Sequence, residues 1–359
     1  MNDPGIIGKA VGYDNAARLR RSETIDIAVR RGVLPPDRLF INGFPASHPA
    51  AVFNPGHILD GDRLVLFPRI ILGYYKYVSA IAEAVIPLED VLDGTVGVNT
   101  YSASLAILPS NKYDLWGAED PRAYRIGGLE AVTYTGRTRL YFESDSDKTL
   151  PITAFKRNGK WVKSIAHKPS KHLNGMVSND KNAFLVNHND RLYLFHRPQL
   201  RSGEYLLLAS LVDPGILEEP GSGDPVETEP RADWEVIQPA GFEEKIAWGP
   251  PPIHLSGDEY LFLLHGVGKR LQAYRVFAAL IELPRGEPPV VKAVTPRYIM
   301  EPREAYEVYG DRPYTVFPCG ASRVGGELLV TYGAADYMAG FATISMDDLM
   351  AELDKGRIN

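Results

Sequence analysis

The stretch NDKNAFLVNHNDRLYLF, from Asn179 to Phe195, contains the pattern on which the predicted fold rests. It begins with a polar element, Asn179–Asn182, and continues to a turn-rich segment, Asn187–Asp190, which precedes the apolar run Arg191–Phe195. Asn and Asp tolerate the backbone conformations of tight turns, and short apolar runs bounded by such residues are typical of β-strands. We therefore interpret the stretch as a polar element followed by a hairpin strand.

The same pattern recurs along the chain. The apolar runs that follow a Gly, Asp or Asn turn are Arg63–Phe67, Glu130–Tyr134, Arg191–Phe195, Glu259–Leu264 and Glu327–Tyr332. The polar or proline-rich elements that precede them are Phe53–Pro55, Glu119–Arg122, Asn179–Asn182, Gly249–Pro252 and Phe317–Gly320. The spacing is roughly 60 to 70 residues, and such a period indicates copies of one supersecondary unit.

Five units of this length, each with room for four short strands, predict an all-β, five-bladed β-propeller. The innermost strand of each propeller blade lines the axis, so the polar elements should meet at one mouth although they are distant in sequence. A β-sandwich is the alternative architecture.

The two ends of the chain lack this repeat. Residues 1–50 are interpreted as an N-terminal extension, residues 51–345 as the propeller, and residues 346–359 as a C-terminal helix. The extension either covers the mouth or mediates assembly into a homo-oligomer.

Local signals predict a helix in each terminal segment. Ser22 caps the first, with Arg30 near its end and Gly32 past it, and Ser345 caps the second. The segment Asp213–Asp233 is rich in Pro, Gly and acidic residues, so we expect an exposed loop there.

Composition narrows the class of protein. With 45 acidic and 39 basic residues the formal net charge is -6, which argues against a nucleic-acid surface. The single cysteine, Cys319, excludes an intrachain disulfide, and no zinc-type spacing appears among the eight histidines. Neither a signal peptide nor an apolar run of membrane-spanning length is visible. We expect a cytoplasmic protein that contacts no membrane and holds no metal.

The densest catalytic candidate is Glu119-Asp120-Pro121-Arg122. A proline fixes the backbone beside the carboxylate, and an Arg two residues on points to the same face of a strand. If Asp120 opens onto a narrow mouth, burial raises its pKa and makes it a general acid. The alternative is an ion pair between Glu119 and Arg122 at a strand end.

The string Trp116–Arg122, WGAEDPR, followed by Thr133–Thr135, resembles glycoside hydrolase family 130, the β-mannoside phosphorylases and β-mannosidases. Further similar strings occur in the family's order: Asn54-Pro55 with Arg69, Asn179–Lys181 with His196–Pro198, Gly249–Ile253 with His265–Val267, and Phe317–Gly320 with Tyr332–Asp336. The resemblance covers about Asn54 to Asp336 and implies a five-bladed propeller, in agreement with the repeats.

The resemblance also implies roles. Asp120 is the catalytic acid, which protonates the glycosidic oxygen through a sugar hydroxyl. The substrate-binding residues that it implies, together with the neighbours of the acid, are Asn54, Arg69, Ser102, Glu119, Arg122, His196 and Asp336. The phosphate-binding residues that it implies are Lys181, Arg197, Lys245 and His265. Two alternatives stay open: Lys181 pairs only with Asp180, and His265 is a core histidine.

The expected reaction is inverting phosphorolysis of β-1,2- or β-1,4-linked manno-oligosaccharides to mannose 1-phosphate, a glycosyltransferase-type reaction. Inorganic phosphate is the co-substrate, and no cofactor is needed. The first alternative is an inverting β-mannosidase, because Glu243-Glu244 precedes Lys245 and a second carboxylate is needed to activate water. The second is a propeller that binds sugar without catalysis.

Overall fold

The computed structural model describes residues 7–74, 77–138, 149–217 and 224–358, and its fold is all-β. Most strands form antiparallel series that follow the chain. The first series is β4 (Ala51–Asp60), β5 (Arg63–Gly73), β6 (Val78–Pro87) and β7 (Tyr101–Ile107), and the second is β8 (Ala118–Ile126), β9 (Leu129–Arg137), β10 (Thr149–Arg157) and β11 (Lys160–His167). The third is β12 (Val177–His188), β13 (Arg191–Leu200), β14 (Leu208–Val212) and β16 (Ala232–Glu235), and the fourth is β17 (Glu243–Trp248), β19 (Glu259–Gly268), β20 (Tyr274–Glu282) and β21 (Val290–Val294). The fifth is β22 (Val316–Val324), β23 (Glu327–Ala334), β24 (Met338–Ser345) and β2 (Ala28–Leu34).

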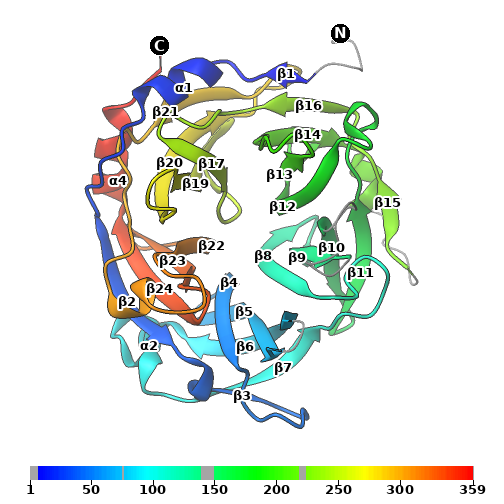
Figure 1. Ribbon diagram of the computed structural model, residues 1–359, viewed down its shortest axis with the longest axis vertical. Helices are drawn as coiled ribbons and strands as arrows, with labels where there is room; N and C mark the ends of the chain where they lie inside the picture. Colours follow the sequence, from blue (N-terminus) through cyan, green and yellow to red (C-terminus); the bar gives the residue numbers. More distant parts are fainter. Residues whose placement is uncertain (1–6, 75–76, 139–148, 218–223, 359) are drawn as a thin grey trace.

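The described strands pair into four sheets, of ten, five, four and five strands. The ten-stranded sheet joins two of the series through a single parallel pair, Thr149 opposite Asn179. Short strands extend the sheets: β1 (Gly8–Lys9), β3 (Leu39–Ile41), β15 (Val226–Thr228) and β18 (Ile253–Ser256). The series are arranged around a common centre, with β4, β8, β12 and β22 nearest to it (Figure 1). The all-β part of the prediction is therefore confirmed.

The predicted hairpins are also confirmed, because the five apolar runs lie in β5, β9, β13, β19 and β23. The turns before them use left-handed backbone, with φ of 62° at Gly61 and 59° at Asp190. Such turns match the twist of the two strands that they join.

Between neighbouring series the sheets pack face to face. Trp248 of β17 is fully buried against Phe184 of β12, Phe195 of β13 and Phe262 of β19, with ring centroids 5.0–6.4 Å apart. Aromatic pairs at these separations are favourable beyond the area that they bury. The core is thus divided among the interfaces between sheets, which leaves the inner strand ends free to carry polar residues.

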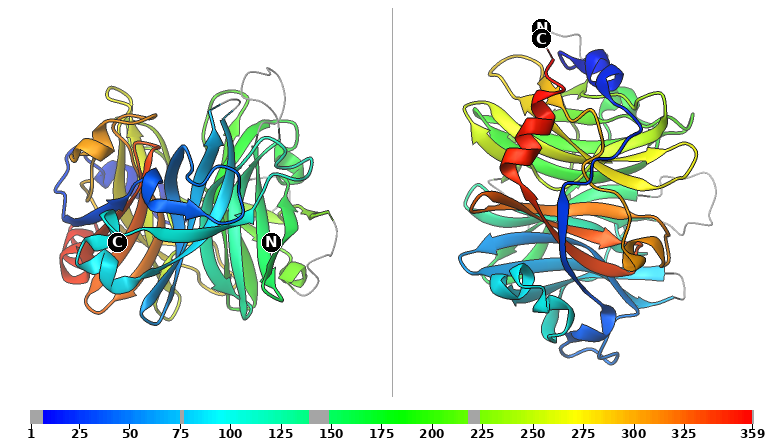
Figure 2. Two further views of the ribbon diagram at one scale, coloured as in Figure 1. Left: turned by 90° about the horizontal axis from the view of Figure 1, so that it is seen from below. Right: turned by 90° about the vertical axis from the view of Figure 1, so that its left-hand side faces the viewer.

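The predicted helix after Ser22 is wrong. The helix in this region is α1 (Tyr13–Leu19), and Arg30 lies instead in β2, which pairs antiparallel with β24. Pairing with β24 outweighs the local helix signals, since tertiary contacts routinely override propensity. The first fifty residues therefore contribute a strand to the last series, and their path along the outer surface is visible in Figure 2.

The other terminal prediction is confirmed. Helix α4 (Met346–Asp354) begins after Ser345, whose hydroxyl accepts a hydrogen bond from the backbone N–H of Asp348 at 3.3 Å. The remaining helical elements are η1 (Pro36–Arg38), α2 (Leu88–Leu92), η3 (Thr95–Gly97), η4 (Lys171–Leu173), η5 (Pro214–Leu217) and α3 (Ala305–Val308). No helix in the described ranges has the length and apolar character needed to cross a membrane.

The predicted loop Asp213–Asp233 is corrected in part. Residues 218–223 lie outside the described residues, but the rest contains η5, β15 and the start of β16. Strand β15 pairs in parallel with β11 of another series, so this segment ties two series together.

Candidate active site

A repeated backbone irregularity aims polar side chains at the centre of the molecule. The register of β4, β8 and β12 shifts beside Asn54, Asp120 and Asn182, and these residues have φ of 48°, 49° and 58°. Asn and Asp adopt this left-handed conformation more easily than other non-glycine residues. A β-bulge re-aims the side chain that it displaces. Equivalent bulges on separate strands thus direct three polar side chains inward.

The strands that carry Asn54 and Asp120 approach closely. A Cβ on Gly56 would lie 2.8 Å from the carbonyl oxygen of Pro121, so only glycine allows this contact. Asn54 Nδ2 can therefore donate a hydrogen bond to Asp120 Oδ1 at 2.7 Å.

Asp120 is held as a carboxylate. It is 9% exposed, and Arg69 Nη1 donates to its Oδ1 at 2.9 Å. Burial acts to raise the pKa of Asp120, but Arg69, Lys181 and Arg122 outweigh burial and lower that pKa to about 2. The predicted rise in pKa is wrong, because three cations around the carboxyl group outweigh the effect of burial.

Glu119 is completely buried beside Asp120. Its carboxylate lies 3.0 Å from Arg69 Nη2, 3.2 Å from Lys181 Nζ and 3.5 Å from Arg137 Nη1. The suggested pair with Arg122 is not formed, and Lys181 pairs with Glu119 and not with Asp180. Glu119 therefore sets the positions of the cations around Asp120.

Arg122 is also completely buried and lies behind the site. Its guanidinium donates to the backbone carbonyl oxygens of Gly249 (2.9 Å), Asp120 (2.7 Å) and Trp248 (3.4 Å). The prediction that Arg122 binds substrate is corrected, because these contacts fix the backbone of Asp120 and join β8 to the end of β17.

A cavity of about 220 Å³ on one side of Asp120 is rich in cations. It is lined by Asp120, Asn179, Lys181, Asn182, Arg197, Gln199, Tyr205, Lys245, Ala247, His265, Tyr274, Arg312 and Phe317. All four residues predicted to bind phosphate are among them. We call this space the cation cavity.

The cations of this cavity are not fully compensated. Arg197 is buried, and its Nε and Nη1 have no hydrogen-bond partner among the described residues. Burial, Arg197 and Arg312 lower the pKa of Lys245 to about 8. Burial and the nearby Arg122 lower the pKa of His265 well below its ordinary value, so its ring is neutral. Uncompensated donors of this kind favour a bound anion.

A second cavity, of about 200 Å³, adjoins the first. It is lined by Asn54, Arg69, Tyr77, Asp120, Lys181, Tyr274, Arg312, Thr315, Phe317 and Asp336, so Asp120 belongs to both. Burial and the charge of Asp120 raise the pKa of Asp336 to about 6. This cavity, which we call the polar cavity, offers hydrogen-bond donors and acceptors of the kind that sugar hydroxyls need.

Four predicted site residues lie outside both cavities: Glu119 and Arg122, described above, and Ser102 and His196. Ser102 is exposed on β7, the strand of its series that pairs with β3, because β7 runs on the outer side of the sheet. His196 is buried, with Nδ1 2.7 Å from Asp180 Oδ2 and Nε2 2.8 Å from Ser210 Oγ.

This Asp180–His196–Ser210 chain has the connectivity of a catalytic triad. Ser210 is fully buried, however, and donates to Asp233 at 2.5 Å, so no substrate can reach its oxygen. The chain stabilises the backbone that presents the neighbouring Lys181 and Arg197.

Sequence reasoning missed Arg312, Tyr205 and Tyr274. Arg312 lines both cavities and lies over the Tyr274 ring at 4.6 Å. These residues lie in loops or at strand ends outside the repeated elements. The one available signal was the turn-forming sequence Gly310-Asp311-Arg312-Pro313 shortly before β22.

The glutamates considered as a hydrolytic base lie elsewhere. Glu243 is buried, and its carboxylate accepts hydrogen bonds from Arg20 Nη2 at 2.8 Å and from the hydroxyl of Tyr298. Glu244 accepts a hydrogen bond from the side-chain amide of Gln272. Of the described carboxylates, only Asp120 and Asp336 line the two cavities. No cluster of three or more described His, Cys, Asp or Glu side chains is arranged to hold a metal ion.

Comparison with known proteins gives concordant matches. Residues 18–355 match the model of glycoside hydrolase family 130, described as beta-1,4-mannooligosaccharide phosphorylase. A beta-1,2-mannobiose phosphorylase of Thermoanaerobacter sp. (strain X514) is 30% identical over 83% of this chain and 91% of that protein. A 1,2-beta-oligomannan phosphorylase of the same strain is 25% identical over 84% of this chain and 92% of that protein. The solved beta-1,2-mannobiose phosphorylase from Listeria innocua has a similar fold, with a TM-score of 0.64, 18% identity and coverage of 90% and 96%.

Proposed function

The chain belongs to glycoside hydrolase family 130, and from this premise we propose that it catalyses inverting phosphorolysis of β-mannosides to mannose 1-phosphate. The observation that carries the proposal is the position of Asp120 between two cavities, one suited to an anion and one to a sugar. We further propose that the antiparallel series are the blades of a five-bladed propeller, since each predicted repeat corresponds to one series.

Phosphate would occupy the cation cavity. Arg197 supplies two donors that have no hydrogen-bond partner in the described part of the chain, and Lys245 and Arg312 add positive charge at the same space. Charge-assisted hydrogen bonds from such groups hold phosphate oxygens strongly. No protein base is required there, because phosphate is itself the nucleophile.

The mannosyl unit would occupy the polar cavity, where Asn54, Arg69 and Asp336 face it. In the reaction, a phosphate oxygen bonds to the anomeric carbon while the bond from that carbon to the glycosidic oxygen breaks. The leaving oxygen takes up a proton that derives from Asp120, relayed by a sugar hydroxyl.

Proton donation requires Asp120 to be protonated, although the surrounding cations lower its pKa to about 2. A bound phosphate would offset the positive charge of Lys181 and its neighbours, and the pKa of Asp120 would rise accordingly. Substrate binding thus converts a resting carboxylate into the acid.

The proposal rests on phosphate dependence, so the test is to incubate β-1,2- and β-1,4-mannobiose with and without inorganic phosphate. We expect mannose 1-phosphate and mannose in equal amounts from at least one of the two disaccharides, only when phosphate is present. The relatives above make β-1,2-mannobiose the first substrate to try. Release of mannose alone at the same rate without phosphate would show hydrolysis and overturn the proposal.

A further inference from the structure

We propose that Arg30 and Glu307 are positioning residues of the site, which hold the loop that carries Arg312. This inference rests on the proposed function for its effect on phosphate. The loop, residues 309–314, places Arg312 against both cavities, while Arg30 and Glu307 line neither. The two residues act through the backbone of the loop.

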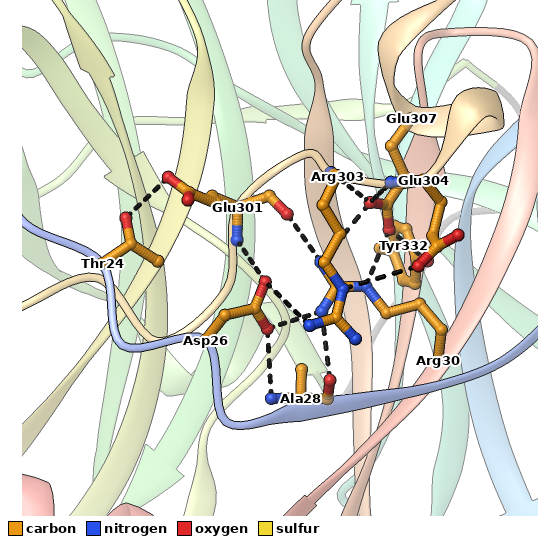
Figure 3. A network of polar contacts seen from close by, with 9 residues as sticks. All are labelled: Thr24, Asp26, Ala28, Arg30, Glu301, Arg303, Glu304, Glu307 and Tyr332. Carbon is orange, nitrogen blue, oxygen red and sulfur yellow. Dashed lines mark hydrogen bonds and ion pairs between the residues drawn. The ribbon is translucent and has the colours of Figure 1, made fainter.

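Glu307 lies at the start of this loop, in α3, and is completely buried. Its carboxylate accepts hydrogen bonds from the backbone N–H groups of Arg303 (2.8 Å) and Glu304 (3.0 Å) and from the Tyr332 hydroxyl (2.7 Å). Arg30 Nε donates to it at 3.0 Å (Figure 3). Donors from four residues thus converge on one buried carboxylate, and they fix α3 and the direction in which the chain leaves it.

Arg30 brings the N-terminal segment into this network. Its Nη1 lies 2.5 Å from Asp26 Oδ1, and its Nη2 donates to the carbonyl oxygen of Glu301 at 2.6 Å. Thr24 donates to Glu301 Oε2 at 2.7 Å in the same region (Figure 3). Arg30 therefore pairs with the buried carboxylate of Glu307 and with the partly buried carboxylate of Asp26, which Arg303 Nη1 also approaches at 4.0 Å. Removal of Arg30 would leave Glu307 without a paired cation among the described residues.

The contacts continue from Glu307 to the site. The carbonyl oxygen of Glu307 accepts from the N–H of Thr315 at 3.0 Å, which closes the base of the loop. Arg312 N–H donates to the carbonyl oxygen of Ala335 at 3.0 Å, next to Asp336. The carbonyl oxygen of Tyr314 accepts from Tyr274 N–H at 3.0 Å.

These bonds place the Arg312 guanidinium over the ring of Tyr274. Displacement of the base of the loop would shift Arg312 relative to Lys245 and Arg197, which belong to other strands. The network is thus a route by which the N-terminal segment affects phosphate binding.

The test compares Arg30→Met and Glu307→Gln with Arg31→Met. Arg31 is the next residue of the same strand and pairs with Glu327 of β23 at 3.3 Å, away from the loop, so it is a matched control. We expect the KM for phosphate to rise about tenfold in Arg30→Met and in Glu307→Gln, within the range for residues of one network. Arg31→Met should leave the KM for phosphate unchanged, and Arg30→Lys should raise this KM less than Arg30→Met does. Thermal unfolding measures the stability of each variant.

A double-mutant cycle separates positioning from general destabilisation. If Arg30 acts through Arg312, Arg30→Met should have no further effect on the KM for phosphate in an Arg312→Ala background. Equal effects in both backgrounds, or a tenfold effect of Arg31→Met, would overturn the inference.

Titration of inorganic phosphate by calorimetry gives a readout that does not need turnover. If the wild-type protein binds phosphate but forms no mannose 1-phosphate, the proposed function fails. The inference is then tested by the same double-mutant cycle, with the dissociation constant for phosphate measured in place of the KM. If turnover is normal but the cycle is additive, only the inference fails.

Discussion

The two cavities beside Asp120 differ in how their charges are balanced. In the polar cavity Arg69 is bound to both Glu119 and Asp120, so its charge is compensated within the protein. In the cation cavity Arg197 retains donors without a partner among the described residues, and burial together with the neighbouring Arg197 and Arg312 lowers the pKa of Lys245. Cations alone therefore do not identify an anion site. An anion site is indicated by cations whose charge and hydrogen-bond donors are not matched by protein carboxylates.

Among the described carboxylates, Asp120 alone lines both cavities, so its replacement has the largest expected effect. Asp120→Asn keeps the shape but cannot supply a proton, and we expect kcat to fall by about 10³-fold or more, at the scale of general acid catalysis. Steady-state kinetics with mannobiose and phosphate measure it.

A matched control is Asp114→Asn, which alters a buried carboxylate bound to Tyr134 and Lys163 outside both cavities. That variant should lose stability and keep its kcat once folded. Comparable loss of kcat in the control, or normal turnover in Asp120→Asn, would contradict the role of Asp120.

The next comparison sets one cavity against the other. Arg197→Ala should raise the KM for phosphate about 10- to 100-fold, as expected for loss of hydrogen bonds from a charged group. Its effect on the KM for mannobiose should be smaller.

Asn54→Ala should raise the KM for mannobiose more than the KM for phosphate. It should also lower kcat, because Asn54 binds Asp120 directly. Initial rates with each substrate varied in turn give both constants, and a reversed pattern would exchange the assignments of the two cavities.

The pKa of Asp336, raised to about 6, predicts a pH effect confined to the polar cavity. Asp336 is protonated below that pH and becomes a charged acceptor for sugar hydroxyls above it, so the KM for mannobiose should fall as the pH rises through about 6. Asp336→Asn should raise this KM about tenfold at pH 7, as for loss of a charged hydrogen bond, and remove the pH dependence. An unchanged pH profile in Asp336→Asn would contradict the assignment.

The smallest expected effect concerns Lys245, whose pKa is lowered to about 8. Lys245 carries its charge below that pH and loses it above, so phosphate affinity should decline as the pH rises beyond about 8. Arginine stays protonated throughout this range, and Lys245→Arg should therefore flatten the decline. Calorimetric titration of phosphate at several pH values measures it, and identical slopes in the two proteins would show that Lys245 does not contact phosphate.

Much of the site could be predicted because its backbone has a local cause. Asn54 and Asp120 are residue types that tolerate left-handed backbone, each precedes a proline, and each sits in a repeated element. The repeat predicted their convergence, and the structure brings Asn54, Arg69, Lys181 and Asp336 to one centre.

The remainder depends on contacts that the sequence does not reveal. His196 and Arg197 are adjacent on β13, and their side chains point in opposite directions. His196 is therefore buried between Asp180 and Ser210, while Arg197 lines the cation cavity. Arg312 reaches the site from a loop, and β2 forms because β24 has a free edge for it. The pKa of Asp120 depends on cations from separate segments of the chain, which no local pattern predicts.

A crystal structure of the protein with inorganic phosphate and a mannoside would test the central claim most directly. The account predicts the phosphate within hydrogen-bond distance of Arg197 and Lys245, and the mannosyl ring in the polar cavity beside Asn54, with Asp120 between the two. Phosphate bound in the polar cavity against Arg69, with the cation cavity empty, would contradict it.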